Sequence, residues 1–307
     1  MNHRNRTMKN QFNGLTESMA RSITRRGALK RFGVGLAGIA LARFGVNDVH
    51  AITNGALDGG AHPNVGGVIW LVSPWPDATA PVVCGSGALV HPRVYLTAGH
   101  GTDLVESLIA QGFLTVGDLR VSFAADAANP ATWLRVSGVL THPGFAPNAT
   151  SSEDVGVLIL ERPVTSIPVV PLAPAGFLDA RSADGSLKTK SDRAFLRVVG
   201  YGVVPDSNAG HLPFPPDGLR RSAQPEFQNL HDRWLYTDQN DSHDNSGSCK
   251  CDSGGPLFYV DSVTGKETLV AVVSRGSLSS AHDYRVDTEV ALDFINDVIA
   301  AVEAGRL

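Results

Sequence analysis

Residues 251–256 read Cys-Asp-Ser-Gly-Gly-Pro, and two earlier segments of the chain carry side chains that match this serine in chemistry. Thr-Ala-Gly-His occupies 97–100, and Asp-Val-Gly-Val-Leu-Ile-Leu occupies 154–160. A serine hydroxyl is a weak nucleophile at neutral pH, so it needs a base to take its proton and a carboxylate to orient that base. The three segments supply a histidine, an aspartate and a serine in that order, which predicts a nucleophilic serine site.

The order of these groups along the chain indicates the fold. Unrelated folds build the same constellation in different chain orders, and His100, Asp154 and Ser253 follow the order of the chymotrypsin-like proteases. From about Ile52 onward the sequence resembles the trypsin/chymotrypsin family of serine endopeptidases, as a bacterial, exported member. Further segments that carry the likeness are Ile-Thr-Asn-Gly at 52–55, Val-Val-Gly-Tyr-Gly at 198–202 and Val-Ser-Arg-Gly-Ser at 273–277.

A serine flanked by glycines also occurs in α/β-hydrolases, but the segment fits that fold poorly. The nucleophile of those enzymes lies in Gly-x-Ser-x-Gly at the start of a helix. Here Cys251 occupies the first glycine position, and Gly254, Gly255 and Pro256 oppose helix formation.

The resemblance implies an all-β fold of the chymotrypsin-like type, with two packed six-stranded antiparallel β-barrels and a C-terminal α-helix. We expect the first barrel at about 52–163, a linker at about 164–190, and the second barrel with the helix at about 191–307. Short apolar or alternating runs separated by turn residues agree with this. They lie at 68–72, 82–90, 94–98, 114–116, 119–123, 134–140, 155–160, 195–199, 234–237, 256–260, 268–274 and 285–287.

Two further segments of the second half have their own patterns. The stretch 205–225 is rich in proline and polar residues, so we expect a long surface loop there. Near the end of the chain, apolar residues recur at helical spacing after two potential caps, Asp287 and Thr288. They are Val290, Phe294, Val298 and Val302.

The first 51 residues resemble a twin-arginine export signal. Thr-Arg-Arg-Gly-Ala-Leu-Lys at 24–30 precedes a Gly- and Ala-rich apolar run at 32–46, and Val-His-Ala at 49–51 fits a signal-peptidase site. The apolar run is interrupted by Arg43 and is short for a bilayer span, so we expect no permanent membrane anchor. The pattern predicts removal of residues 1–51 and export to the periplasm or the medium; a disordered basic arm is the alternative.

Removal of this segment changes the charge of the protein. Nine of the 26 Lys and Arg residues, but only two of the 30 Asp and Glu residues, precede Ile52, which leaves a net charge of about −11. Such a charge argues against nucleic acid and anionic membranes as partners. We expect protein or peptide substrates, and the sequence does not indicate an oligomeric state.

The resemblance implies a role for each group of the constellation, without a cofactor. His100 would accept the Ser253 proton and later donate it to the leaving amine, while Asp154 holds the imidazole in the useful tautomer. The backbone N–H groups of Cys251 and Ser253 would stabilise the oxyanion of the tetrahedral intermediate. An esterase would share this site and mechanism.

Cys251 departs from the family pattern, which has glycine at this position. A Cβ here could turn the peptide plane that must direct its N–H at the oxyanion. A catalytically weak or inactive protease-like binding protein is therefore the alternative to an active endopeptidase.

In the resembling family, the α-amino group of the mature chain pairs with the aspartate before the nucleophile. Here the pair would be Ile52 and Asp252. A buried carboxylate is costly unless it is paired, so the new ammonium would order the oxyanion loop. Signal removal would then also activate the enzyme.

The substrate would be bound by residues on either side of the cleft. Position 247, where trypsins specific for Lys and Arg carry aspartate, is a glycine, but Asp283 or His282 could enter the pocket from the opposite wall. Lys250 and Arg275 either favour acidic groups near the scissile bond or extend into solvent. The implied substrate-binding residues are Gly247, Ser248, Lys250, Ser274, Arg275 and Gly276.

Cys84 and Cys249 match family cysteines whose usual partners are absent here, and Cys251 replaces a glycine. The resemblance implies a Cys84–Cys251 or a Cys84–Cys249 disulfide, and either choice leaves one free thiol. Metal binding is not expected from Cys-Lys-Cys, and the acidic loop at 238–245 lacks the spacing of an EF-hand.

Overall fold

The computed structural model describes residues 55–76, 78–147, 152–187, 196–203, 214–243, 245–277 and 279–307. The expected export signal and Ile52 lie outside these residues. Within them, the chain forms two β-sheets and three α-helices, so the predicted chymotrypsin-like architecture is confirmed. None of the helices that the structure describes is both long and apolar enough to cross a membrane.

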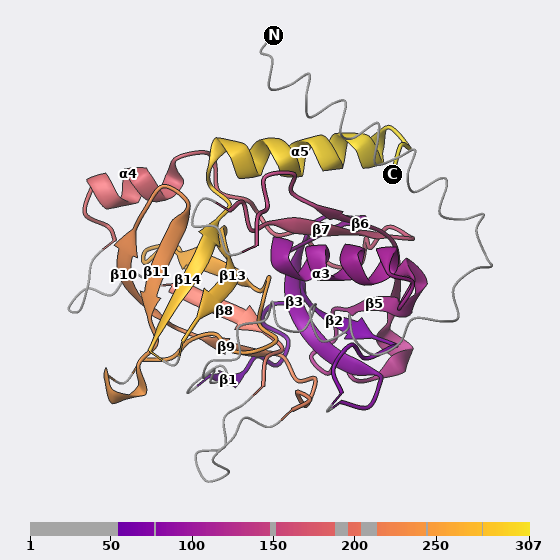
Figure 1. Cartoon of the computed structure of the whole chain (residues 1–307). Helices are drawn as coiled ribbons and strands as arrows, with labels where there is room; N and C mark the ends of the chain where they lie inside the picture. Colours follow the sequence, from indigo (N-terminus) through magenta and orange to yellow (C-terminus); the bar gives the residue numbers. More distant parts are fainter. Residues whose placement is uncertain are drawn as a thin grey trace.

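The first sheet is a closed antiparallel barrel in the order β2-β3-β4-β7-β6-β5 (Figure 1). Its strands have buried, β-branched and leucine-rich inner faces, which is what closure around a side-chain-filled interior requires. The predicted run at 114–116 is not one of them, because this segment enters the 3₁₀ turn η1 (Val116–Asp118) instead. The strands are β2 (Val65–Trp70), β3 (Val82–His91), β4 (Val94–Thr97), β5 (Leu119–Ser122), β6 (Leu134–Thr141) and β7 (Gly156–Leu160).

The second sheet has eight strands in the order β1-β9-β8-β12-β13-β14-β11-β10, and no ladder joins β1 to β10 among the described residues. The expectation of a second six-stranded barrel therefore needs correction. The strands are β1 (Ala56–Leu57), β8 (Leu196–Gly200), β9 (Arg221–Ala223), β10 (Glu226–Leu230), β11 (Trp234–Asp238), β12 (Pro256–Val260), β13 (Glu267–Gly276) and β14 (Ser280–Arg285).

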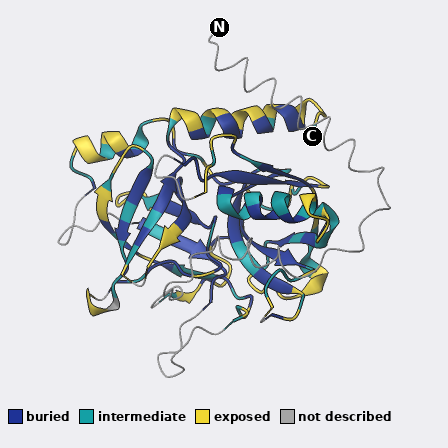
Figure 2. Cartoon of the chain, viewed as in Figure 1, coloured by how far each residue is buried: buried dark blue, intermediate teal, exposed yellow. Residues whose placement is uncertain are grey.

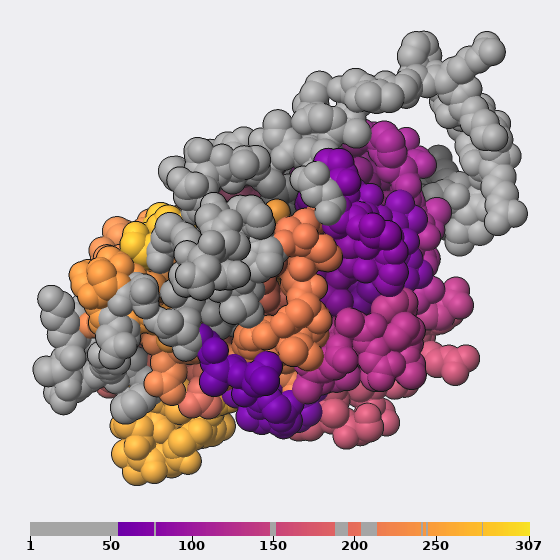
Figure 3. Space-filling view, turned by 90° about the horizontal axis from the view of Figure 1, so that it is seen from below, coloured from indigo at the N-terminus to yellow at the C-terminus, as the bar shows by residue number. Residues whose placement is uncertain are grey.

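Two local causes explain the extra strands. Gln224 and Pro225 separate β9 from β10, since proline has no N–H to donate to a ladder and interrupts what would otherwise be one strand. β9 itself lies inside the stretch that was expected to be a loop. The N-terminal segment then adds β1 to the free side of β9, with Ala56 opposite Ser222. In Figure 3 an indigo segment, from the start of the described chain, lies apart from the other indigo residues and against residues from later in the chain.

The helices connect and cover these sheets. Two of the helices were not predicted. One is α3 (Gly99–Ala110), which follows β4 and packs against β6 and β7, and the other is α4 (Phe177–Ala183) in the linker. The predicted C-terminal helix is α5 (Glu289–Glu303), and the Thr288 hydroxyl caps it by accepting a hydrogen bond from the Ala291 N–H over 3.3 Å. One detail was wrong: Val290 is exposed rather than part of the buried face.

The main apolar cluster draws on both sheets. Val65 and Leu96 of the first barrel belong to the same cluster as Trp234 and Tyr284 of the second sheet, and Phe294 of α5 joins them. Figure 2 shows that the strands of both sheets are largely buried, while the outer turns of α5 are exposed. The two sheets are therefore fixed against each other, and the segments at their junction can hold a precise site.

Candidate active site

His100 lies in the first turn of α3, directly after β4, and Asp154 lies directly before β7. Because β4 and β7 are paired neighbours, with Thr97 opposite Gly156, the two residues meet at one end of the barrel. The His100 ring Nδ1 is 2.9 Å from Oδ2 of Asp154 and 3.2 Å from Oδ1. The His100 backbone N–H also donates to Oδ1 over 2.6 Å. The carboxylate thus fixes both the ring and the start of the helix.

The electrostatics of this pair favour an ionised carboxylate and a basic imidazole. Burial alone would raise the pKa of Asp154, but the charge and hydrogen bond of His100, with the hydroxyl of Ser274, hold that pKa below its usual value. Burial alone would lower the pKa of His100, but the charge and hydrogen bond of Asp154 outweigh it and raise the pKa. An Nδ1–H that donates to Asp154 leaves Nε2 as the basic nitrogen of the neutral ring.

Ser253 lies in the turn before β12 and is partly exposed. Its carbonyl oxygen accepts a hydrogen bond from the Ser86 N–H of β3 over 2.9 Å. The next residue, Gly254, donates its N–H to the Val273 carbonyl over 2.7 Å. Val273 directly precedes Ser274, the residue that bonds Asp154. Hydrogen bonds of Ser253 and Gly254 therefore hold this turn against β3 of the first sheet and β13 of the second.

Gly254 also places Ser253 beside the segment that carries His100. Its φ of +82° is left-handed, and a Cβ built on it would lie 2.1 Å from the Thr97 hydroxyl and 2.5 Å from the Ala98 nitrogen. Such a close approach admits only glycine. The structure thus brings the three predicted groups to the junction of the two sheets.

Cys251 adopts a φ of +74°, the left-handed conformation that glycine takes readily. The Cys251 carbonyl accepts hydrogen bonds from the Gly85 N–H over 3.1 Å and the Ser86 hydroxyl over 3.2 Å. The preceding carbonyl, of Lys250, accepts from the Val203 N–H over 3.0 Å. In a trans peptide the C=O and the following N–H point in opposite directions, so the Cys251 N–H points away from Val203.

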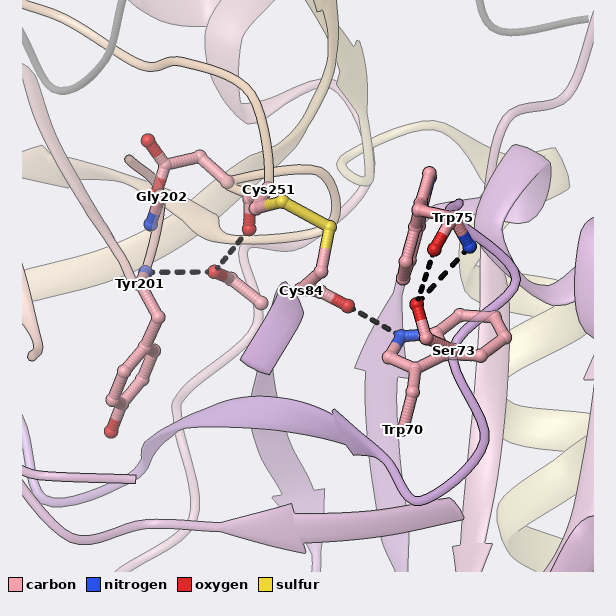
Figure 4. Close-up of a disulfide and its surroundings, with 9 residues drawn as sticks. Trp70, Ser73, Trp75, Cys84, Tyr201, Gly202 and Cys251 are labelled. Carbon is pink, nitrogen blue, oxygen red and sulfur yellow. Dashed lines mark hydrogen bonds between the residues drawn. A yellow bond between two sulfur atoms is a disulfide. The ribbon is translucent and has the colours of Figure 1, made fainter. Parts of the chain in front are cut away.

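Of the two disulfide pairings that the sequence left open, the structure contains Cys84–Cys251 (Figure 4). The bond joins the segment just before Ser253 to β3 of the first barrel. Cys249 is a buried free thiol, and burial raises its pKa far above the usual value. It is therefore protonated at neutral pH.

Asp252 is fully buried behind the loop. Burial raises its pKa to about 7, although the carboxylate accepts hydrogen bonds from the N–H groups of Gly202 (2.7 Å) and Cys249 (2.8 Å). A Cβ on Gly200 or Gly202 would lie 2.2–2.3 Å from a carboxylate oxygen, so these glycines enclose the group closely. The proposed partner, Ile52, lies outside the described residues.

The expected substrate-binding residues flank this loop. Ser274 and Gly276 lie on β13, and Gly276 pairs with Ala281 of β14. The exposed Arg275 and Lys250 do not simply extend into solvent: the Arg275 guanidinium stacks 4.3 Å from the Trp234 ring, and the Lys250 ammonium lies 4.0 Å from the Phe214 ring.

A residue that was not predicted from the sequence, Gln239, lies beside Gly247. A Cβ on Gly247 would lie 2.2 Å from Oε1 of Gln239, and Ser248 lies 3.5 Å from the same oxygen through its hydroxyl. The Gln239 amide donates to the Ser277 carbonyl over 2.6 Å. Gln239 is buried and spans the two segments that were predicted to border the cleft.

The two residues of β14 that could enter the pocket, Asp283 and His282, differ in burial. Asp283 is buried, bonds only weakly to the Thr237 hydroxyl at 3.4 Å, and burial raises its pKa to about 8. Its Oδ1 has no hydrogen-bond partner within the described residues. His282 is partly buried, and its ring lies 4.2 Å from that of Tyr236. The described part of the chain contains no cluster of three or more potential metal ligands.

A second group that sequence analysis missed surrounds Glu153, the neighbour of Asp154. Its Oε1 accepts from Arg233 Nε over 2.7 Å, and its Oε2 accepts from the Tyr284 hydroxyl over 2.5 Å. The two adjacent acidic residues, at 153 and 154, are visible in the sequence. The partners of Glu153 could not be predicted, because they lie on or next to distant strands.

Comparisons with known proteins agree with this geometry. The family model described as Trypsin matches residues 76–299. Brachyurin from Leptuca pugilator is 29% identical to this chain over 206 residues, which cover 64% of this chain and 81% of brachyurin. The matched residues include every strand except β1 and β2, and also include His100, Asp154 and Ser253.

Proposed function

This chain belongs to the trypsin family and is a serine endopeptidase, and we propose that it hydrolyses peptide bonds through Ser253, His100 and Asp154 by way of an acyl-enzyme intermediate. The observation that carries the proposal is the hydrogen bond between Nδ1 of His100 and Asp154 at 2.9 Å. This bond fixes the His100 tautomer in which Nε2 is the base. Ser253 lies at the same junction of the two sheets.

In the proposed reaction, Nε2 of His100 takes the Ser253 proton as Oγ attacks the scissile carbonyl. The same nitrogen then protonates the leaving amine, which leaves an ester on Ser253. Water, deprotonated by His100, attacks this ester, and Ser253 regains its proton as the acid product departs. Asp154 stays ionised throughout and stabilises the imidazolium. The N–H groups of Cys251 and Ser253 stabilise each oxyanion.

The same proposal includes activation by removal of residues 1–51 and export by a twin-arginine-like route. The support is chemical: Asp252 is fully buried with a pKa near 7 and forms no ion pair with another described residue, and the ammonium of Ile52 would supply a counter-charge. The N-terminal sequence of the mature protein tests this directly. A mature chain that begins elsewhere than Ile52 would rule out this activation route.

The competing function is a protease-like binding protein, and the observation that favours it is the non-glycine residue at 251. Its left-handed φ of +74° speaks for catalysis, because this is the backbone that a glycine would adopt. The cysteine therefore alters the side chain more than the course of the backbone.

A fluorophosphonate reagent separates the two functions. We expect stoichiometric labelling of protein that begins at Ile52, read by intact mass, and none of a Ser253→Ala control or of unprocessed protein. Cleavage of a protein substrate should accompany labelling. Absence of labelling in the Ile52 form would favour the binding protein instead.

A further inference from the structure

We propose that Cys84 is a positioning residue for catalysis: its disulfide to Cys251 holds the oxyanion N–H in place, so that activity depends on this one bond being oxidised. The inference rests on the proposed function, since it assigns a means of control to the same oxyanion site. It explains why a residue other than glycine can occupy position 251.

The backbone of Cys251 supplies the first argument. A residue with a Cβ is less stable in the left-handed region than in its ordinary conformations, whereas glycine is not. Cys251 nevertheless holds a φ of +74°. Rotation of the Lys250–Cys251 peptide would relieve this cost at the expense of the hydrogen bond from the Val203 N–H to the Lys250 carbonyl, and would turn the Cys251 N–H away from the substrate. The disulfide is a constraint that acts on this residue directly.

Cys84, at the other end of the disulfide, lies in a rigid part of the first barrel. The Cys84 carbonyl accepts a hydrogen bond from the Trp70 indole over 2.7 Å, as Figure 4 shows. The Trp70 ring packs edge-on against Trp75 at 5.2 Å, and Trp75 packs against Phe214 at 5.8 Å. The next residue, Gly85, donates to the Cys251 carbonyl. Cys84 therefore belongs to a fixed part of the barrel.

The two cysteines of the disulfide differ in their exposure to a reductant. Cys84 is partly exposed, whereas Cys251 is buried. A small dithiol can therefore attack the sulfur of Cys84: its thiolate forms a mixed disulfide there, and Cys251 leaves as a thiolate that takes up a proton. The second thiol of the reagent then closes its own disulfide and releases Cys84 as a thiol, so two electrons pass to the protein. The protonated Cys249 does not compete as an attacking thiolate at neutral pH.

Four forms of the mature protein test the proposal: wild type, Cys84→Ala, Cys251→Gly and the double variant. Each is assayed for kcat and KM on a peptide amide, with and without dithiothreitol, beside its melting temperature. Alkylation and intact mass verify the thiol count. We expect Cys84→Ala and reduced wild type to lose about a hundredfold in kcat, with KM changed by less than about threefold.

The double variant is the decisive one. It lacks the cross-link but has glycine at position 251, so we expect its kcat to return to within about fivefold of wild type and to be insensitive to the dithiol. Cys251→Gly alone has no disulfide to reduce, so its kcat should not change when the dithiol is added. Both Cys84→Ala and the double variant lose the stabilisation of the cross-link, so the melting temperature should fall in both.

The other outcomes overturn the inference in distinct ways. Full kcat in Cys84→Ala would show that the bond does not position the N–H. Equal loss of kcat in Cys84→Ala and the double variant would show that the bond acts through general stability. Failure of oxidised wild type to react with a fluorophosphonate would instead overturn the proposed function, and this inference with it.

Discussion

The hydroxyl of Tyr284 on β14 donates a hydrogen bond to Oε2 of Glu153 over 2.5 Å, which joins the eight-stranded sheet to the residue directly before Asp154. Burial raises the pKa of Tyr284 far above its usual value, and the Glu153 carboxylate raises it further, so the phenol remains a donor. Arg233, next to β11, pairs with the other oxygen of Glu153 at 2.7 Å. The position of the Asp154 carboxylate thus depends on both sheets.

Tyr284→Phe removes this donor while it keeps the ring. The free energy of unfolding should fall by about 1–3 kcal/mol, because a buried carboxylate oxygen loses its partner. Chemical denaturation at constant pH measures the change. Tyr259→Phe, on a partly exposed ring of β12, should change stability by less than about 0.5 kcal/mol. Equal effects of the two substitutions would contradict the importance of the Glu153 bond.

Asp154→Asn should lower kcat by on the order of 10⁴, because the amide no longer selects the tautomer in which Nε2 is the base. It should also move the pH profile. The base acts when deprotonated, so kcat/KM rises with pH through the His100 pKa, which Asp154 raises. Loss of the carboxylate should shift this acidic limb to lower pH, and a profile that stays in place would speak against the pairing.

Gly254→Ala should destabilise the protein by about 3 kcal/mol or more, since the new Cβ would overlap the Thr97 hydroxyl and the Ala98 nitrogen. Gly265→Ala is a matched control, because Gly265 also has a positive φ, +69°, but no atom lies within 4 Å of the added Cβ. It should lose only about 1 kcal/mol. Thermal unfolding of both variants separates steric overlap from backbone preference.

His62→Gln should change how stability depends on pH. Burial alone would lower the pKa of His62, but Asp58 and Glu267, which bond its two ring nitrogens, raise it to about 9. A raised histidine pKa stabilises the folded state fully below pH 6.5, and this contribution disappears as the pH rises to about 9.

At about 1.4 kcal/mol per pKa unit, wild type should lose up to about 3 kcal/mol across this window that the variant does not lose. Urea titrations at several pH values give the difference curve between the two proteins. Arg220 and Arg197, which pair with the same two carboxylates, are present in both proteins, so their effect cancels. A flat difference curve from pH 6 to 9.5 would refute the assignment.

Gln239→Glu should favour substrates with Lys or Arg before the scissile bond. The amide oxygen of Gln239 lies where a side chain at position 247 would begin. A carboxylate at position 239 therefore places negative charge beside Gly247. We expect the ratio of kcat/KM for basic over apolar substrates to rise about tenfold, which corresponds to about 1.4 kcal/mol. A library of peptide substrates measures this, with Gln111→Glu on the exposed end of α3 as control.

The parts of the site that could be predicted are those encoded by short segments. Ser253 and its glycines form a local turn, and the barrel strands follow from local alternation. The Cys84–Cys251 pairing could not be chosen from sequence, because Cys249 and Cys251 are two residues apart and only the course of the loop decides which one faces β3.

Contacts between distant segments were also beyond sequence reasoning. Gln239 and Tyr284 are ordinary strand or loop residues by composition, and their roles arise only when β11, β13 and β14 come together. Strands β1, β9 and β10 of the second sheet were not predicted, and β1 has only two residues, too few to give an alternating pattern.

Helix α5 comes last in the sequence but packs across the junction of the sheets, and its Phe294 ring lies 4.9 Å from that of His142 beside β6. Chains are synthesised from the N-terminus, so the barrel strands leave the ribosome long before this helix. During translation, the apolar surface that α5 covers is therefore open to water and to chaperones. The packing of Phe294 against His142 forms only after α5 has emerged, so this contact comes late in the folding of the chain.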